Sequence, residues 1–188
     1  MDTIAATSDP FPGLHILGRI ASWLNACRTL HAATMTQPYD SDYAHTDILF
    51  TTLAGNAITG SHLMNRVMDH EDHLAFARYA NAVRAAAMDP NPITDWHPPD
   101  DATAACQKAL GNACTNRRFF TTVNGRIGIG PLPTRTGDLV AVLRRQGNPV
   151  ILRPSGEVYQ LAGGSYVHGI MDGEALADDV EEMVFELV

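Results

Sequence analysis

The chain has little positive charge. Its 188 residues include 13 Lys and Arg against 21 Asp and Glu, for a formal net charge of -8, and Lys108 is its one lysine. Binding along the phosphate backbone of a nucleic acid depends on clustered lysine and arginine. We therefore expect no nucleic-acid partner. Arginine supplies nearly all the positive charge, and its planar guanidinium suits fixed pairs better than diffuse surface charge.

Long apolar runs and a secretion signal are also missing. No continuous apolar stretch approaches the roughly 20 residues that cross a bilayer. The start, MDTIAATSDPFPG, lacks the basic residues and the apolar core of a secretory signal. The chain contains three cysteines, an odd number, which without export we expect to be reduced and structural: Cys27, Cys106 and Cys114. The sequence predicts a cytoplasmic protein without a membrane span.

Apolar residues at helical spacing predict four helices in the first part of the chain. We expect them over residues 14–34, 43–58, 61–88 and 102–115, with Ser61 as the N-cap of the third. Residues 1–13 are expected to form a flexible N-terminal lead-in. Trp96 falls in a proline-rich stretch, 93–101, that is typical of an irregular loop.

The character of the sequence changes at Arg117. Phe119–Val123 predicts a strand, Asn124-Gly125 is typical of a type I′ hairpin, and alternating isoleucines follow on the return strand. Further short strands, separated by Gly- and Pro-containing turns, are expected at 139–143, 150–152, 158–161, 166–170 and 183–188. The prediction is an α+β fold. A helical region, 14–116, packs on a small antiparallel β-barrel or curled sheet, 117–188, as one folded unit.

The last third carries a specific pattern of segments. They read RRFFTTVNGRIGIGP at 117–131, GDLVAVL at 137–143, VILRP at 150–154 and YQLAGGSYVHGIMDGEAL at 159–176. In order and spacing these segments resemble the C-terminal region of fungal heterokaryon-incompatibility (HET) proteins. The resemblance implies the β fold more firmly than any activity, because many glycines in it serve turns and close strand contacts.

The chain is expected to depart from that family pattern in two ways, and both bear on its predicted function. Family members carry a large HET domain upstream, and a chain that begins at its own Met1 is expected to lack it. Residues 45–58 are more weakly similar to the family's helix around an Arg-Thr-Leu motif, with Thr51 in the place of the arginine. A diverged helical half therefore indicates a function different from that of the full-length proteins.

Three groups of residues could carry chemistry. His168 could act as a general acid–base oriented by Asp172, although a structural, buried imidazole is the favoured interpretation. The cluster 69–73 contains two histidines on one helical face, but it lacks the His-Glu-x-x-His pattern, so we predict a solvated face and no metal site. Arg117 and Arg118 could grip an anion; structural pairing with Asp138, Glu157 or Asp172 is the favoured alternative.

The leading functional hypothesis is a cofactor-free cyclase of fungal secondary metabolism. The sequence shows no nucleophile–base pair, metal motif or phosphate loop, and a [4+2] cyclisation needs none of these, because holding the substrate in a near-attack geometry accelerates it. Stand-alone HET-like domains are similar to natural-product enzymes such as the norbornene-forming Diels–Alderase of sordaricin biosynthesis. That likeness implies an apolar terpenoid substrate and no cofactor.

The residues expected to serve such a site fall into two groups. The candidate hydrogen-bond donors to the substrate are His168, Arg118 and Tyr166, and the expected walls of an apolar pocket are Trp23, Trp96, Phe119 and Met64. This hypothesis predicts a preformed apolar cavity of about 300–1,000 Å³. The alternative is a HET-derived protein-interaction or regulatory module, which predicts an apolar surface patch.

Overall fold

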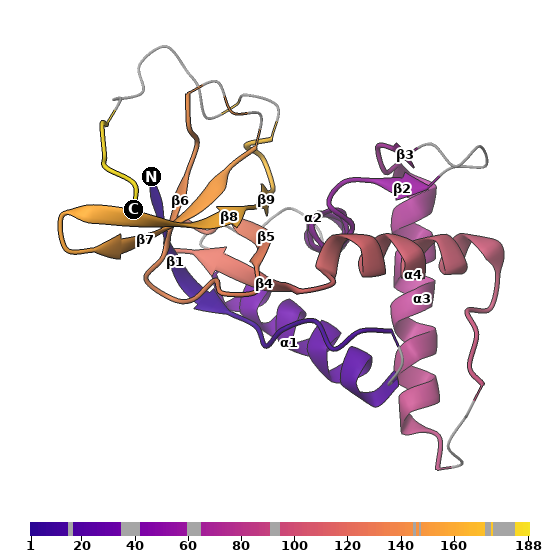
Figure 1. Cartoon of the computed structure of the whole chain (residues 1–188). Coiled ribbons are helices and arrows are strands. Elements are labelled where there is room, and N and C mark those ends of the chain that lie inside the picture. Colours follow the sequence, from indigo (N-terminus) through magenta and orange to yellow (C-terminus); the bar gives the residue numbers. More distant parts are fainter. Residues whose placement is uncertain are drawn as a thin grey trace.

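The computed structural model describes residues 1–14, 17–34, 42–59, 65–90, 95–144, 146, 148–171, 174 and 183–188. Its helices are α1 (Leu17–Thr34), α2 (Asp42–Ala54), α3 (His70–Met88) and α4 (Asp101–Cys114). Its strands are β1 (Asp2–Thr7), β2 (Ile58–Thr59), β3 (Asn65–Arg66), β4 (Arg117–Thr122), β5 (Ile127–Pro131), β6 (Leu139–Ala141), β7 (Val150–Ser155), β8 (Val158–Gly164) and β9 (Tyr166–Val167). The predicted α+β class is confirmed (Figure 1).

The third helix begins nine residues later than predicted. Asp69 caps α3, because its carboxylate accepts a hydrogen bond from the Asp72 backbone N–H and the Asp72 carboxylate accepts one from the Asp69 N–H. This reciprocal capping box starts the helix at His70, and the short β2–β3 hairpin precedes it. Ser61, predicted as the cap, lies outside the described residues.

Seven strands form one antiparallel sheet in the order β8-β7-β6-β1-β4-β5-β9. The two edge strands, β8 and β9, follow each other in the chain with only Ser165 between them. The sheet must therefore curl until its edges meet at that residue. Within the described residues no ladder joins β8 to β9, so the sheet is curled, as predicted, and not closed into a barrel by hydrogen bonds.

The N-terminal segment is part of the sheet, and the predicted flexible lead-in over residues 1–13 is wrong. β1 lies between β6 and β4 near the middle of the sheet, where Figure 1 shows it in indigo among the orange strands. Its pairing continues past the strand, since the Ser8 N–H donates to the Phe119 carbonyl at 2.8 Å and the Phe11 N–H donates to the Arg117 carbonyl at 3.1 Å. Residues 2–11 are thus tied to the sheet.

The predicted hairpin between β4 and β5 is confirmed, but its turn is not type I′. Type I′ needs positive φ at both central residues. Gly125 has φ 80°, whereas Asn124 is not among the non-glycine residues with positive φ. The Gly125 N–H donates to the Thr122 carbonyl at 3.1 Å, so one left-handed glycine closes the turn.

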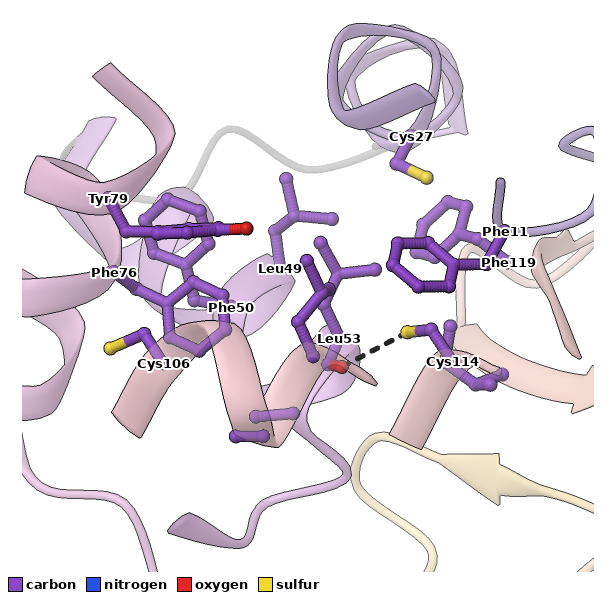
Figure 2. Packing of buried hydrophobic residues seen from close by; sticks show 14 of the residues in the cluster. Phe11, Cys27, Leu49, Phe50, Leu53, Phe76, Tyr79, Cys106, Cys114 and Phe119 are labelled. Atoms are coloured by element: carbon purple, nitrogen blue, oxygen red, sulfur yellow. Dashed lines mark hydrogen bonds between the residues drawn. The ribbon is translucent and has the colours of Figure 1, made fainter. Parts of the chain in front are cut away.

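One hydrophobic cluster joins the helices to the sheet. It contains buried residues of all four helices together with Phe119 of β4 and Ile127 and Ile129 of β5. Figure 2 shows Phe119 beside Phe11, and Phe50, Phe76 and Tyr79 grouped on the other side of Leu49 and Leu53. A smaller cluster around Ile4 and Phe120 lies on the other face of β4 from Phe119, and a Cβ on Gly128 would lie 2.5 Å from the Phe120 ring. Close packing therefore requires glycine at that position.

The three cysteines lie in the core, as predicted, and are free thiols. The Cys114 thiol donates to the Leu53 carbonyl at 3.2 Å, which Figure 2 shows as a dashed line. Burial raises the pKa of the Cys27 and Cys114 thiols well above the usual range, and it raises the pKa of Cys106 to about 12. All three side chains are therefore neutral thiols near neutral pH.

We predict that the native protein does not react with Ellman's reagent at pH 8. The thiolate is the nucleophile, and a pKa of about 12 leaves roughly one Cys106 side chain in 10⁴ ionised at that pH. In denaturant the three thiols are exposed with ordinary pKa values, and all should react within minutes. Release of one or more equivalents from the folded protein, with its circular dichroism unchanged, would contradict the buried placement.

Candidate functional site

The side chain of Arg118, a predicted hydrogen-bond donor to the substrate, binds backbone carbonyls of the protein itself. Its Nε–H donates to the Leu132 carbonyl at 2.9 Å and its Nη1–H to the Ser8 carbonyl at 3.0 Å. Arg117 donates to the Gly164 carbonyl at 3.3 Å. The predicted pairing of these arginines with Asp138 is wrong, because they bind backbone carbonyls and Asp138 has another partner.

That partner is Arg153, and the pair explains two segments of the family pattern. Asp138 precedes β6 and Arg153 lies on β7, so the Gly-Asp and Arg-Pro segments meet across neighbouring strands. Nε and Nη2 of Arg153 each donate to Asp138 at 2.9 Å, and the Arg135 backbone N–H donates to the same carboxylate at 2.9 Å. The Asp138 side chain is 1% exposed. These residues hold the sheet together.

His168 follows β9 and is half-buried. Its backbone N–H donates to the Ile127 carbonyl at 3.0 Å, and its Nδ1 has no hydrogen-bond partner among the described residues. Burial lowers the pKa of His168, while Glu174 raises it. The imidazole is thus biased towards the neutral form. Asp172, its predicted orienting partner, lies outside the described residues, so a catalytic role for His168 stays a prediction.

Three of the predicted pocket walls are described, and none of them lines either of the two cavities reported below. Phe119 is fully buried in the core, and Trp23 is buried against Phe11 with its Nε1–H donating to the Asp9 carbonyl at 2.9 Å. Trp96 is half-buried beside Tyr79, with ring centroids 6.2 Å apart. Met64 lies outside the described residues. Trp23, Trp96 and Phe119 are therefore part of the main hydrophobic core or packed against it.

A cavity of about 330 Å³ lies where β9 and β5 meet the helices. Tyr166 and Arg117 line it from the sheet, and Ala109 and Asn112 line it from α4. Of the described residues of the predicted site, Tyr166 alone lines this cavity. The cavity is near the lower end of the usual size of ligand sites.

The cluster 69–73 organises a helix start. Asp72 is buried, and it takes part in both capping hydrogen bonds, since its carboxylate accepts from the Asp69 N–H and its own N–H donates to the Asp69 carboxylate. It also pairs with Arg66, whose Nη2 lies 2.8 Å from its Oδ1. His73 Nε2 lies 2.9 Å from the Thr51 hydroxyl of α2. The predicted solvated face is thus partly wrong, since Asp72 and His73 connect α3 to its neighbours. No group of three potential metal ligands occurs in the part of the chain that the structure describes.

A larger cavity, of about 590 Å³, lies among α1, α2 and α3. Its wall contains Leu49 and Phe50 of α2, alanines of α1 and α3, and a group of polar residues: Asn25, Arg28, His31, Thr46, Asn81 and Arg84. Behind the wall, the buried Tyr79 hydroxyl has no hydrogen-bond partner among the described residues, and Figure 2 shows it pointing towards Leu49. This cavity has the size and the mainly apolar wall of a small-molecule site.

The sequence contains a signal for this cavity that our sequence analysis missed. Asn25-Ala-Cys-Arg28 on α1 and Asn81-Ala-Val-Arg84 on α3 are the same Asn-Ala-x-Arg motif. In both motifs the third residue is buried in the core, at Cys27 and Val83, and the asparagine and arginine line the cavity. The packing of α1 and α3 thus places the asparagine and the arginine of both motifs at the same cavity.

Comparison with known proteins places the chain in a family. Residues 56–188 match the Het-6 beta-barrel domain. Over 76 residues the chain is 41% identical to heterokaryon incompatibility protein 6, OR allele, of Neurospora crassa; that segment is 38% of this chain and 11% of the relative. No solved structure matches. The matched region omits β1, which the sheet nevertheless contains. This match covers more than half of the chain, so the chain belongs to the Het-6 β-barrel domain family.

Proposed function

We propose that this chain binds an apolar small molecule in the cavity among α1, α2 and α3. The observation that carries the proposal is the cavity itself, whose volume of about 590 Å³ lies inside the range of about 300–1,000 Å³ typical of ligand sites. Leu24, Leu49 and Phe50 provide apolar contact area, and the alanines leave the space that larger side chains would fill.

A cofactor-free cyclisation is the reaction that we propose for such a site. A cavity of this size can fold a flexible polyene so that diene and dienophile approach each other, which lowers the entropic part of the barrier. A hydrogen bond to a carbonyl on the dienophile would add electrostatic stabilisation. In this cavity the donor would be Asn25, Asn81 or an arginine. Arg118 and Tyr166 are in strands and His168 directly follows β9, and none of the three lines this cavity.

Filling the cavity tests the binding proposal. We expect N-phenyl-1-naphthylamine, a neutral apolar dye, to bind the native protein with an increase in fluorescence, and we expect Ala80→Trp to remove that binding because the indole occupies the space. Ala85→Trp is the matched control, since Ala85 is exposed on the same helix and does not line the cavity. Binding that survives Ala80→Trp in a folded variant would refute the location.

The cyclisation is tested separately. Incubation with a terpenoid diene aldehyde should give a cycloadduct faster than buffer alone and with one dominant stereoisomer, and Ala80→Trp should return the reaction to the buffer rate. A native protein that binds the dye but leaves rate and stereochemistry at the buffer values would leave a binding domain without this activity.

A protein-interaction module is the second candidate, favoured by the exposed apolar residues at the C-terminus. The tail pairs with β8, because the Tyr159 N–H donates to the Glu186 carbonyl at 2.8 Å and the Val188 N–H donates to the Tyr159 carbonyl at 2.9 Å. Val184, Leu187 and Val188 are exposed there, as is Leu161 of β8. This candidate predicts co-purification with the Neurospora crassa relative that is lost in Val184→Asp/Leu187→Asp and unaffected by Ala80→Trp.

A further inference from the structure

We infer that the ligand of the larger cavity carries an anionic group, held between the two Asn-Ala-x-Arg motifs of α1 and α3. The inference rests on the proposed function and adds the chemical class of the ligand, an apolar molecule with one carboxylate-like or sulfonate-like group. Three observations carry it: the hydrogen-bonding state of the motifs, the distribution of charge, and the apolar remainder of the wall.

In both motifs the arginine donates a hydrogen bond to the asparagine, and all four side chains are exposed at the wall of the cavity. Arg28 donates to the Asn25 side-chain oxygen at 3.0 Å, and Arg84 donates to the side-chain oxygen of Asn81 in the same way. A guanidinium has no acceptor, so each amide must turn its oxygen towards its arginine. The amide N–H groups and the remaining guanidinium N–H groups are left to face a ligand, and an anion accepts hydrogen bonds from both.

Within the part of the chain that the structure describes, the two arginines at the cavity have no acidic residue beside them. Arg28 and Arg84 line it, and among the described residues no Asp or Glu does. Helix α1 contains no acidic residue, and α3 contains none after Asp72. Among the described residues neither Arg28 nor Arg84 forms an ion pair. In a chain of net charge -8 this local excess of positive charge favours an anion.

The other wall residues determine the rest of the ligand. Leu24, Leu49, Phe50 and the alanines of α1 and α3 are apolar, and a free inorganic anion would leave their surface without a partner. A molecule with an apolar body and an anionic end matches both parts of the wall. A phosphate ester with a polar body would fit less well, because it would leave the apolar part of the wall without a partner.

Two dyes that differ only in charge test the inference. 8-Anilino-1-naphthalenesulfonate carries the skeleton of N-phenyl-1-naphthylamine plus one sulfonate. We expect Arg28→Gln/Arg84→Gln to weaken binding of the sulfonate dye roughly tenfold or more, since two charge-assisted contacts are lost, and to change binding of the neutral dye less than about twofold. Arg19→Gln/Arg78→Gln is the control, with the same change in net charge on the same two helices and no residue in the cavity wall.

A second measurement needs no variant. Raising the ionic strength from about 0.05 to about 1 M should weaken binding of the sulfonate dye to the native protein and leave the neutral dye bound at least as tightly. For the variants of the first measurement, circular dichroism verifies that each is folded.

The possible results separate the two proposals. If the native protein binds both dyes and Arg28→Gln/Arg84→Gln binds the sulfonate dye as tightly as the native protein, the anion inference is overturned while the cavity remains a ligand site. If Arg19→Gln/Arg78→Gln weakens binding of the sulfonate dye equally, the anion inference is also overturned, because the change in net charge alone then explains the weaker binding. If the native protein binds neither dye, the proposed function itself fails.

Discussion

Deletion of residues 2–8 is expected to abolish cooperative folding. β1 pairs with β6 on one side and β4 on the other, so its removal leaves two strand edges without partners in the middle of the sheet. It also removes Ile4, which is 1% exposed and packs in the cluster with Phe120 and Val140. Unpaired strand edges promote aggregation, so we expect an insoluble or molten product.

Thermal unfolding followed by circular dichroism checks this prediction. Deletion of residues 183–188 is the matched control, because that tail lies at the sheet edge. It adds the pairing at Tyr159 and the contact of the half-buried Phe185 with the Tyr159 ring, and its other side chains are exposed. The control should keep a cooperative transition within a few degrees of the native one. A cooperative transition of native midpoint in the variant without residues 2–8 would show that β1 is dispensable.

Replacement of Asp138 by Asn is expected to lower the free energy of unfolding by about 3–5 kcal/mol, the usual cost of leaving a buried ion pair without one partner. Asp138 accepts two hydrogen bonds from the Arg153 guanidinium and one from the Arg135 backbone N–H, and it is shielded from solvent. Asparagine removes the charge and presents an N–H group to a guanidinium that can only donate.

Urea denaturation at neutral pH measures the effect. Asp95→Asn provides the control, because Asp95 is exposed and its contact with His97 lies in solvent, so its loss should change the free energy of unfolding by less than about 1 kcal/mol. A change below about 1 kcal/mol in Asp138→Asn would mean that Asp138 and Arg153 do not hold β6 and β7 together.

Local features of the fold were predictable from sequence. Short-range apolar spacing located α1 and α4 to within three residues, and Asn124-Gly125 located the hairpin between β4 and β5. The start of α3 was misplaced because apolar residues before Asp69 continue the helical spacing, whereas the capping box there decides the boundary.

The N-terminal strand could not be recognised from its own residues. Among Asp2–Thr7, Ile4 is the one large apolar side chain, so no alternating pattern marks a strand. The segment pairs with strands more than 110 residues later in the chain, as the partnership of Ile4 with Thr122 shows. Tertiary pairing of that kind leaves little local signal.

The candidate site could be predicted only in part, because it too depends on tertiary contacts. Aromatic residues drew attention because they are large, yet Trp23 and Phe119 fill the core, and the larger cavity is lined by alanines that no composition argument selects. The repeated Asn-Ala-x-Arg motif was visible in the sequence. Its meaning depends on α1 and α3 both facing the same cavity, which only the packing of the helices shows.

The most direct test of the ligand cavity is an NMR titration of ¹⁵N-labelled protein with N-phenyl-1-naphthylamine. We predict amide shift changes concentrated at residues that line the larger cavity, among them Leu24, Leu49 and Ala80, with the amides of Leu161 and Leu187 unchanged. Changes confined to the C-terminal tail and β8, or no changes at saturating dye, would contradict a ligand site among α1, α2 and α3.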